Sequence, residues 1–139
     1  MDDAKRSKDT GKLLGHHVEN KLNSCADGLK TTLGPNTWPI VRDLVDDIFL
    51  VSEEDILRAT KLIWERLKVT IEPSAGVGVA VALGKEFREK YSVGSGFQRV
   101  GIVLCGGNVE VPGKNLEVPR KNEEVPGTKL EVPVKNVAC

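Results

Sequence analysis

Hydrophobic positions recur at helical spacing in the middle of the chain and predict two helices. Between Ser52 and Lys68, apolar residues repeat every three or four positions, with charged residues between them: Ile56, Ala59, Ile63 and Leu67. Ser52 followed by Asp55 resembles a capping box, which indicates a helix start near residue 53. A second helix is expected from Pro73, a residue favoured in the first helical turn, with its end between Lys85 and Tyr91.

Two shorter apolar runs, residues 48–51 and 100–104, predict buried strands. Strands that are apolar on both faces, separated by helices, are typical of a parallel sheet covered on both sides. The expected fold class is therefore α/β. Two strands alone would leave open edges and little core, so the pattern indicates part of a larger domain.

The second run ends in Cys105-Gly106-Gly107-Asn108, a tight turn at the carboxyl end of the expected strand. Ligands bind at this end of the strands in open α/β sheets, and glycines let the backbone approach them closely. Cys105 is then placed to face a ligand. The alternative is a buried, unreactive thiol before an ordinary turn, and spacing alone leaves both interpretations open.

Weaker signals predict two more helices towards the N-terminus. Residues 3–12 are expected to form one or two helical turns. A helix is also expected to begin near Pro39, with Thr37 as its cap. The adjacent His16 and His17 have no Cys or His partner at ligand spacing, so a solvated loop is expected there.

Composition narrows the classes of function. The 139 residues include 20 basic and 20 acidic side chains and only 4% aromatics, which argues against binding to nucleic acid or anionic membranes. No apolar run is long enough for a signal core or membrane span, so a cytoplasmic protein is expected. Three widely spaced cysteines indicate neither a disulfide framework nor a metal knuckle.

Glu-Val-Pro recurs every seven residues near the C-terminus, beginning at Glu110, Glu117, Glu124 and Glu131. One proline per repeat excludes the coiled coil that a period of seven would otherwise suggest. We expect residues 1–110 to form the domain, and residues 111–139 to form a disordered low-complexity tail. The tail is either a solvated product of repeat expansion or an array of ligand motifs.

Several of these motifs occur in an order that resembles the C-terminal part of the serine racemase and dehydratase family of pyridoxal-phosphate enzymes. They are Ala26-Asp27-Gly28, Asn36-Thr37-Trp38-Pro39, residues 42–47, Trp64-Glu65-Arg66, Glu72-Pro73 and Cys105-Gly106-Gly107-Asn108. The resemblance covers about residues 2–110. It implies part of the three-layer sheet of the large domain in the tryptophan-synthase-β type of fold, known as fold type II.

The resemblance also implies positions around the pyridoxal-phosphate ring. Cys105, followed by Gly106, would face the pyridine nitrogen, and Gly28 would pack on the ring. Asp27 and Glu72 would belong to the surrounding polar network. A neutral thiol with a pKa near 8.5 cannot keep the pyridine nitrogen fully protonated, as a carboxylate would. This suits racemization of serine or elimination to pyruvate and ammonia. Racemases of this type usually carry Ser at the position of Cys105, whereas Cys is similar to some serine dehydratases.

Effector sites follow from the same resemblance. Lys68 and Asn108 match positions that contact ATP between subunits, which would imply a homodimer. Asp3, the Met1 carbonyl and Asn36 match a site for magnesium or calcium. On composition alone, Asp3 would be read as an ordinary solvated carboxylate near a terminus.

The printed sequence contains no Ser-x-Lys-x-Arg-Gly motif for covalent cofactor binding and no glycine-rich phosphate loop. No catalytic residue is therefore assigned, and this polypeptide alone is expected to be inactive towards a serine-like substrate. Two alternatives remain open at this point. One is a non-catalytic protein that pairs with a full-length homologue, and the other is a truncated product without function.

Overall fold

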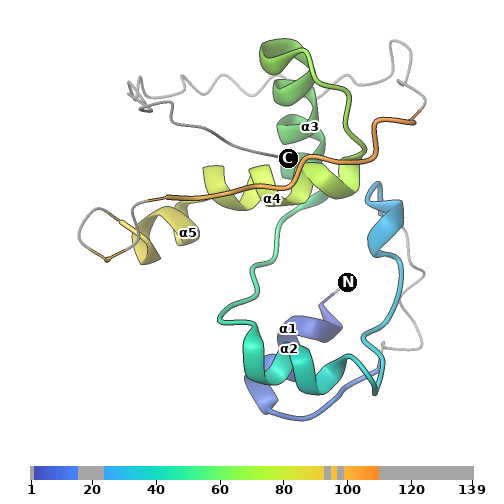
Figure 1. Cartoon of the computed structure of the whole chain (residues 1–139), viewed down its shortest axis with the longest axis vertical. Helices are drawn as coiled ribbons and strands as arrows, with labels where there is room; N and C mark the ends of the chain where they lie inside the picture. The colour runs from blue at the N-terminus through green and yellow to red at the C-terminus, as the bar shows by residue number, and fades with distance from the viewer. Residues whose placement is uncertain (1, 16–23, 93–94, 97–98, 110–139) are drawn as a thin grey trace.

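The computed structural model describes residues 2–15, 24–92, 95–96 and 99–109. Its elements are α1 (Asp3–Thr10), the short 3-10 helix η1 (Asp27–Leu29), α2 (Trp38–Leu44), α3 (Glu53–Leu67), α4 (Pro73–Leu83) and α5 (Lys85–Lys90). Helices α3, α4 and α5 form one part of the molecule, and α1 and α2 lie together in another (Figure 1). The predicted boundary at residue 110 and the tail 111–139 lie outside the described residues.

The core lies between α3 and α4. Ala59 and Ile63 of α3 pack with Ala75, Val79 and Ala80 of α4 around the fully buried Ile71. The helices approach closely because Gly76 faces Thr60, and a Cβ on Gly76 would lie only 2.2 Å from the Thr60 Oγ1 atom. The small residues of α4 therefore serve helix packing, which offsets the cost of glycine in a helix.

Both ends of α3 agree with their sequence signals. The Ser52 side chain accepts a hydrogen bond from the Asp55 N–H at 3.1 Å, which confirms the predicted N-cap. The helix ends at Leu67, and its C-cap residue Lys68 adopts a left-handed φ of 57°. Ile56, Ala59 and Ile63 are buried as expected, whereas Leu67 remains 56% exposed.

Polar contacts of Lys8 join α1 to α2. Lys8 of α1 donates to the Arg42 carbonyl at 2.6 Å, near the C-terminal end of α2. Trp38 is buried, while Ile40 and Leu44 of the same helix are exposed. Thr37 does precede α2, but its hydroxyl donates to the Gly34 carbonyl at 3.1 Å and does not cap the helix.

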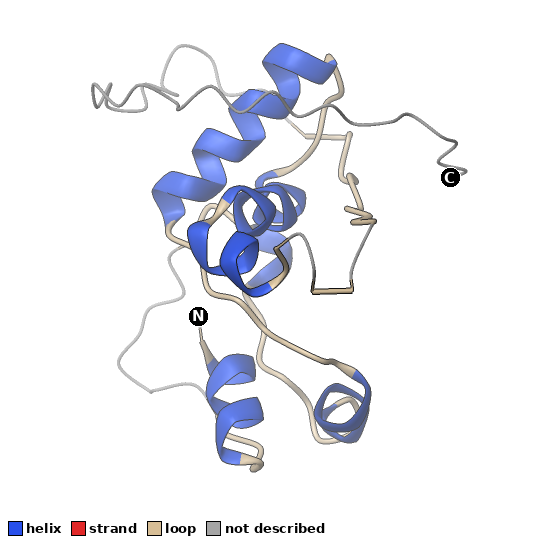
Figure 2. Cartoon of the chain, turned by 90° about the vertical axis from the view of Figure 1, so that its left-hand side faces the viewer, coloured by secondary structure: helices blue, strands red, loops and turns tan. Residues whose placement is uncertain are grey.

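The predicted sheet is not formed by the described residues, and Figure 2 shows helices and loops only. The α/β prediction is corrected in this respect. Strand pairing needs a second backbone at the strand edge, and both predicted strands lie against helices instead. Leu104 packs on the core, and the Ile102 side chain comes within 3.1 Å of the position that a Cβ on Gly78 would occupy.

The helix predicted to run from Pro73 into residues 85–91 is divided in two. Gly84, with φ −67° and ψ 149°, separates α4 from α5. The Phe87 and Tyr91 rings then pack against Phe49, with ring centroids 5.5 and 6.3 Å from that of Phe49. This aromatic cluster fixes residues 48–51 beside α5. Within the described part of the chain, no helix has the length and apolar character needed to cross a membrane.

Candidate cofactor-facing site

Glu72 and Gly106 form the closest packed part of the candidate site. The Glu72 N–H, just before α4, donates to the Cys105 carbonyl at 3.2 Å. Gly106 has φ +72°, and a Cβ there would lie 2.3 Å from Glu72 Cγ and 2.7 Å from Glu72 Oε2. The Glu72 side chain thus lies directly against the Gly106 backbone, and only glycine satisfies both the conformation and the space.

Gly28 joins the same site from η1. Its N–H donates to the Ser74 Oγ atom at 3.0 Å, and a Cβ on Gly28 would lie 3.6 Å from Glu72 Oε1. Two glycines that are far apart in the sequence therefore flank one carboxylate. Glu72 is half-buried.

Ser74 was not singled out by sequence reasoning. A hydroxyl in the first turn of α4, directly after Glu72-Pro73, was the available signal. Its hydrogen bond to Gly28 holds η1 on the start of α4, so Ser74 fixes the distance between Gly28 and Glu72.

The two remaining residues predicted for the cofactor site, Cys105 and Asp27, are exposed. Cys105 lies on the surface at the end of the extended segment, so the interpretation as a buried, unreactive thiol is not supported. The Asp27 side chain is 84% exposed and pairs with Lys30. Asp27 directly precedes Gly28 in η1, but its carboxylate forms a solvent-exposed ion pair with Lys30.

Cys25 forms a separate polar contact with the first turn of α3. Its N–H donates to Glu53 Oε2 at 2.8 Å. Burial, together with the hydrogen bond and negative charge of Glu53, raises the pKa of the Cys25 thiol from 9.0 to about 12. The same hydrogen bonds lower the pKa of Glu53. The contact between Cys25 and Glu53 was not predicted from the sequence.

We predict that Cys25 is alkylated by iodoacetamide at pH 8.5 more slowly than the exposed Cys105, by at least about tenfold, because the thiolate is the nucleophile. Peptide mass spectrometry over time measures both rates. Glu53→Gln should accelerate alkylation of Cys25 only. The pKa of Cys25 is higher in the folded chain than in the unfolded chain. The contribution of Cys25 to the free energy of unfolding is therefore fully present below pH 9 and is lost as the pH rises towards about 12. Equal rates at the two thiols would contradict this arrangement.

The two residues predicted to contact ATP, Lys68 and Asn108, belong to chain segments that meet at Gly107. Lys68 is the exposed residue that ends α3, and Asn108 is exposed in the turn after Gly107. A Cβ on Gly107 would lie 3.3 Å from the Thr70 carbonyl, so this turn lies against the chain two residues beyond Lys68. A role in nucleotide binding remains a prediction.

The three predicted metal ligands are only partly covered by the described residues. Asp3 is buried and accepts a hydrogen bond from the Leu33 N–H at 2.9 Å, whereas Asn36 is exposed. Met1 lies outside the described residues. In the part of the chain that the structure describes, no group of three or more His, Cys, Asp or Glu residues could hold a metal ion. Burial shows that Asp3 is not an ordinary solvated carboxylate, and the magnesium or calcium site remains a prediction.

Comparison with known proteins identifies the family. The model of the family "Pyridoxal-phosphate dependent enzyme" matches residues 2–106. The chain belongs to this family. Serine racemase of Bos taurus is 49% identical over 110 residues, which are 79% of this chain and 31% of that protein.

Solved structures agree with the family assignment. Maize serine racemase matches with a TM-score of 0.68 and 43% identity, over 79% of this chain and 32% of that one. Serine racemase from Dictyostelium discoideum matches with a TM-score of 0.67 and 40% identity, over 79% and 33%. These neighbours are enzymes of fold type II, which confirms the predicted fold family. The chain spans about a third of the length of these relatives.

The chemistry of the residues near Glu72 fits the ring of the family's cofactor. The exposed thiol of Cys105, directly before Gly106, can accept or donate a weak hydrogen bond. The sides of Gly28 and Gly106 on which a Cβ would stand are filled by Ser74 and Glu72, so these glycines allow η1 and the residues after Cys105 to pack on the start of α4. Pyridoxal phosphate is the cofactor of the family to which the chain belongs.

Proposed function

We propose that residues 2–109 form the ring-facing part of a pyridoxal-phosphate site of the serine racemase and dehydratase type. Its reactions would be racemization of serine at Cα and elimination to pyruvate and ammonia. The observation that carries the proposal is the packing of the Glu72 carboxylate between Gly28 and Gly106, because it gathers at one place three of the residues that the resemblance assigns to the cofactor site.

Each residue of this group has a physical role. By resemblance, Gly28 would pack on the ring, and Ser74 holds Gly28 in place by accepting a hydrogen bond from the Gly28 N–H. Gly106 lets the Glu72 side chain lie directly against the backbone. The Glu72 carboxylate provides a fixed negative charge beside the ring. Cys105 would face the ring nitrogen as a neutral partner. When bound, the cofactor supplies the electron-withdrawing ring that stabilises negative charge at Cα.

The covalent attachment and phosphate binding have no counterpart in the printed sequence, so we propose that the polypeptide 1–139 is inactive alone. ATP at Lys68 and Asn108, a divalent cation at Asp3, Asn36 and Met1, and a cytoplasmic location belong to the same proposal. The two effector sites are supported by the resemblance of these residues to the family's effector sites.

The test is a chimera in which residues 2–109 replace the matching segment of maize serine racemase. We expect it to racemise serine and to form pyruvate. Gly106→Ala should lower both rates by about 100-fold, since the added Cβ must displace Glu72 and a misplacement of about 1 Å has effects of this size. Chiral chromatography and a pyruvate assay measure the rates.

Gly15→Ala is the matched control, because no atom lies within 4 Å of a Cβ at that position. Its rates should stay within about twofold of the unmodified chimera, as expected for a surface substitution. Equal rates in the Gly106→Ala and Gly15→Ala chimeras would contradict the proposed site. Circular dichroism of both variants separates a local effect from loss of folding.

A further inference from the structure

The turn that carries Gly28 is compact and buried on one side. The Leu29 N–H closes the turn by donating a hydrogen bond to the Ala26 carbonyl at 3.0 Å. Ala26 is 2% exposed, whereas residues 27–29 are exposed to solvent. Since Cys25 directly precedes this closed turn, a contact that fixes Cys25 also restricts the position of Gly28.

Glu53, in the first turn of α3, holds the start of this turn. Its Oε2 atom accepts the hydrogen bond from the Cys25 N–H at 2.8 Å. Hydrogen bonds from Cys25 and Ser24 lower the pKa of Glu53, so its carboxylate is charged at neutral pH. The Ser24 hydroxyl in turn accepts a hydrogen bond from the Ala26 N–H at 3.1 Å. Hydrogen bonds to an ionised acceptor are stronger than those between neutral groups, so the carboxylate is a firm attachment point.

A second contact attaches the same turn to α4. Figure 1 shows η1 near the start of α4, where the Gly28 N–H donates to Ser74 Oγ at 3.0 Å. The turn is therefore attached at two points, with Cys25 fixed to the start of α3 and Gly28 fixed to the start of α4. Two attachment points keep the exposed face of the turn in one orientation.

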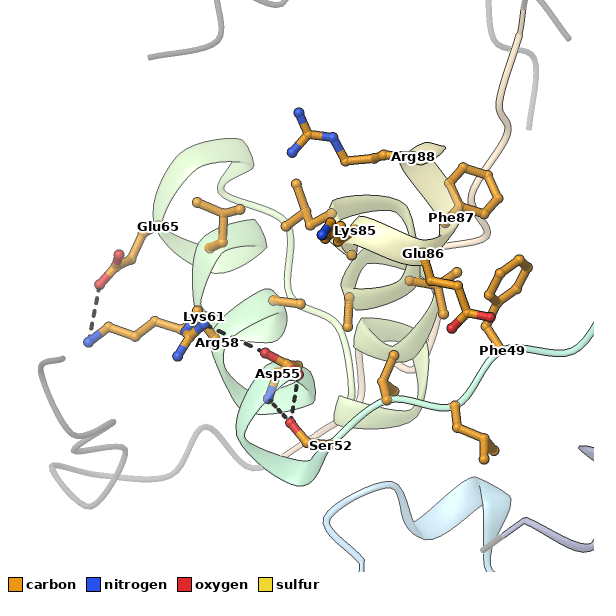
Figure 3. Close-up of a pocket in the computed structure, with 18 residues that line it drawn as sticks. Phe49, Ser52, Asp55, Arg58, Lys61, Glu65, Lys85, Glu86, Phe87 and Arg88 are labelled. Carbon is orange, nitrogen blue, oxygen red and sulfur yellow. Dashed lines mark hydrogen bonds and ion pairs between the residues drawn. The ribbon is translucent and has the colours of Figure 1, made fainter. Parts of the chain in front are cut away.

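The cap of α3 is formed by other residues. The Ser52 hydroxyl donates to Asp55 Oδ2 at 2.6 Å, and Figure 3 shows this pair beside a groove of about 880 Å³ between α3, α4 and α5. Glu54 forms an ion pair with Arg58 at 2.8 Å. Glu53 does not line that groove, and it bonds to a residue 28 positions earlier in the chain. Its contact therefore serves the turn before Gly28 rather than the cap of its own helix.

We propose that Glu53 is a positioning residue for the pyridoxal-phosphate ring, and that it acts through the Cys25 N–H on Gly28. The inference rests on the proposed function, in which Gly28 packs on the ring. Loss of the Glu53 acceptor frees the start of the turn, so Gly28 can leave Ser74 and occupy several positions. The ring then binds to a less preorganised surface, and cofactor affinity falls although every residue that would touch the ring is unchanged.

The first measurement is the hydrogen-exchange rate of the Gly28 amide, resolved by NMR in the full chain without cofactor. Glu53→Ala should raise this rate by at least about fivefold, the size expected for the loss of one hydrogen bond. Glu54→Ala is the matched control, because Glu54 lies in the same helical turn and pairs with Arg58 instead. Its rate should stay within about twofold of the unmodified chain. Equal rates in the two alanine variants would overturn the proposal.

Glu53→Gln separates the hydrogen bond from the charge. Glutamine keeps an oxygen that can accept from the Cys25 N–H, so the Gly28 exchange rate should stay within about twofold of the unmodified chain. The same variant removes the negative charge that raises the pKa of the Cys25 thiol, so alkylation of Cys25 should still accelerate. Exchange at Gly28 as fast in Glu53→Gln as in Glu53→Ala would contradict an anchor made by the hydrogen bond.

The second measurement is titration of pyridoxal phosphate into the maize chimera, followed by cofactor fluorescence. Glu53→Ala should raise the apparent Kd at least about fivefold, whereas Glu53→Gln and Glu54→Ala should stay within about twofold. Unchanged affinity in Glu53→Ala would overturn the positioning role and leave the proposed function intact. A chimera that binds no cofactor would reject the proposed function and, with it, this inference. Thermal unfolding of both alanine variants by circular dichroism distinguishes a local effect from loss of folding.

Discussion

No lysine of the 139-residue chain is expected to form a site-specific covalent bond with added pyridoxal phosphate. Covalent capture requires a lysine held beside the ring and a separate site for the phosphate, and the printed sequence has no motif for either. The residues gathered at Glu72 provide glycines, a carboxylate and a thiol instead. Borohydride reduction followed by peptide mass spectrometry measures the adduct, and the maize enzyme is the positive control.

The position of any adduct decides this prediction. Scattered, substoichiometric labelling of exposed lysines is the expected background, because amines react weakly with free aldehyde in solution. Stoichiometric labelling of one lysine at a cofactor concentration equal to that of the protein would contradict the prediction. It would mean that this third of the family fold already contains a functional attachment site.

Replacing Gly76 with alanine is expected to lower the free energy of unfolding by about 2 kcal/mol. The new Cβ would lie 2.2 Å from Thr60 Oγ1 and 3.2 Å from the Ile56 carbonyl oxygen, so α3 and α4 must separate. Overpacking of this kind costs up to about 3 kcal/mol. The better helix propensity of alanine returns about 1 kcal/mol of that cost. Urea unfolding followed by circular dichroism measures the difference.

Two further variants identify the cause of this loss. Gly15→Ala should change the free energy of unfolding by less than about 0.5 kcal/mol, since its Cβ meets no atom within 4 Å. Thr60→Ala in the Gly76→Ala background should recover more than half of the loss, because it removes the clashing hydroxyl. If Gly76→Ala is as stable as the unmodified chain, the close α3–α4 contact described above is wrong.

The helices could be predicted from sequence because their signals are local. Ser52 with Asp55 marked the start of α3, and Pro73 marked the start of α4. The break at Gly84 was missed because residues on both sides of it fit one helical pattern. The stripe Ile56, Ala59 and Ile63 was found because burial on one helix face follows directly from a period of 3.6 residues.

The strands and the polar contacts of the site could not be predicted in the same way. A strand depends on a neighbouring backbone, and residues 100–104 lie against α4 instead. The contact between Ser74 and Gly28 joins residues 46 positions apart, and no local pattern reports such a distance. Gly106 adopts the left-handed φ that favours glycine, but its contact with Glu72 emerges only from the folded chain.

The role of Cys105 is the most direct test of the proposed site, measured as the rate of pyruvate formation in the maize chimera. Cys105→Ser keeps a neutral hydrogen-bonding group, so we predict a rate within about threefold of the unmodified chimera. Cys105→Asp would hold a proton on the ring nitrogen, and we predict a rate lower by at least about tenfold, which corresponds to about 1.4 kcal/mol. Equal rates for the serine and aspartate variants would show that Cys105 does not face the ring nitrogen.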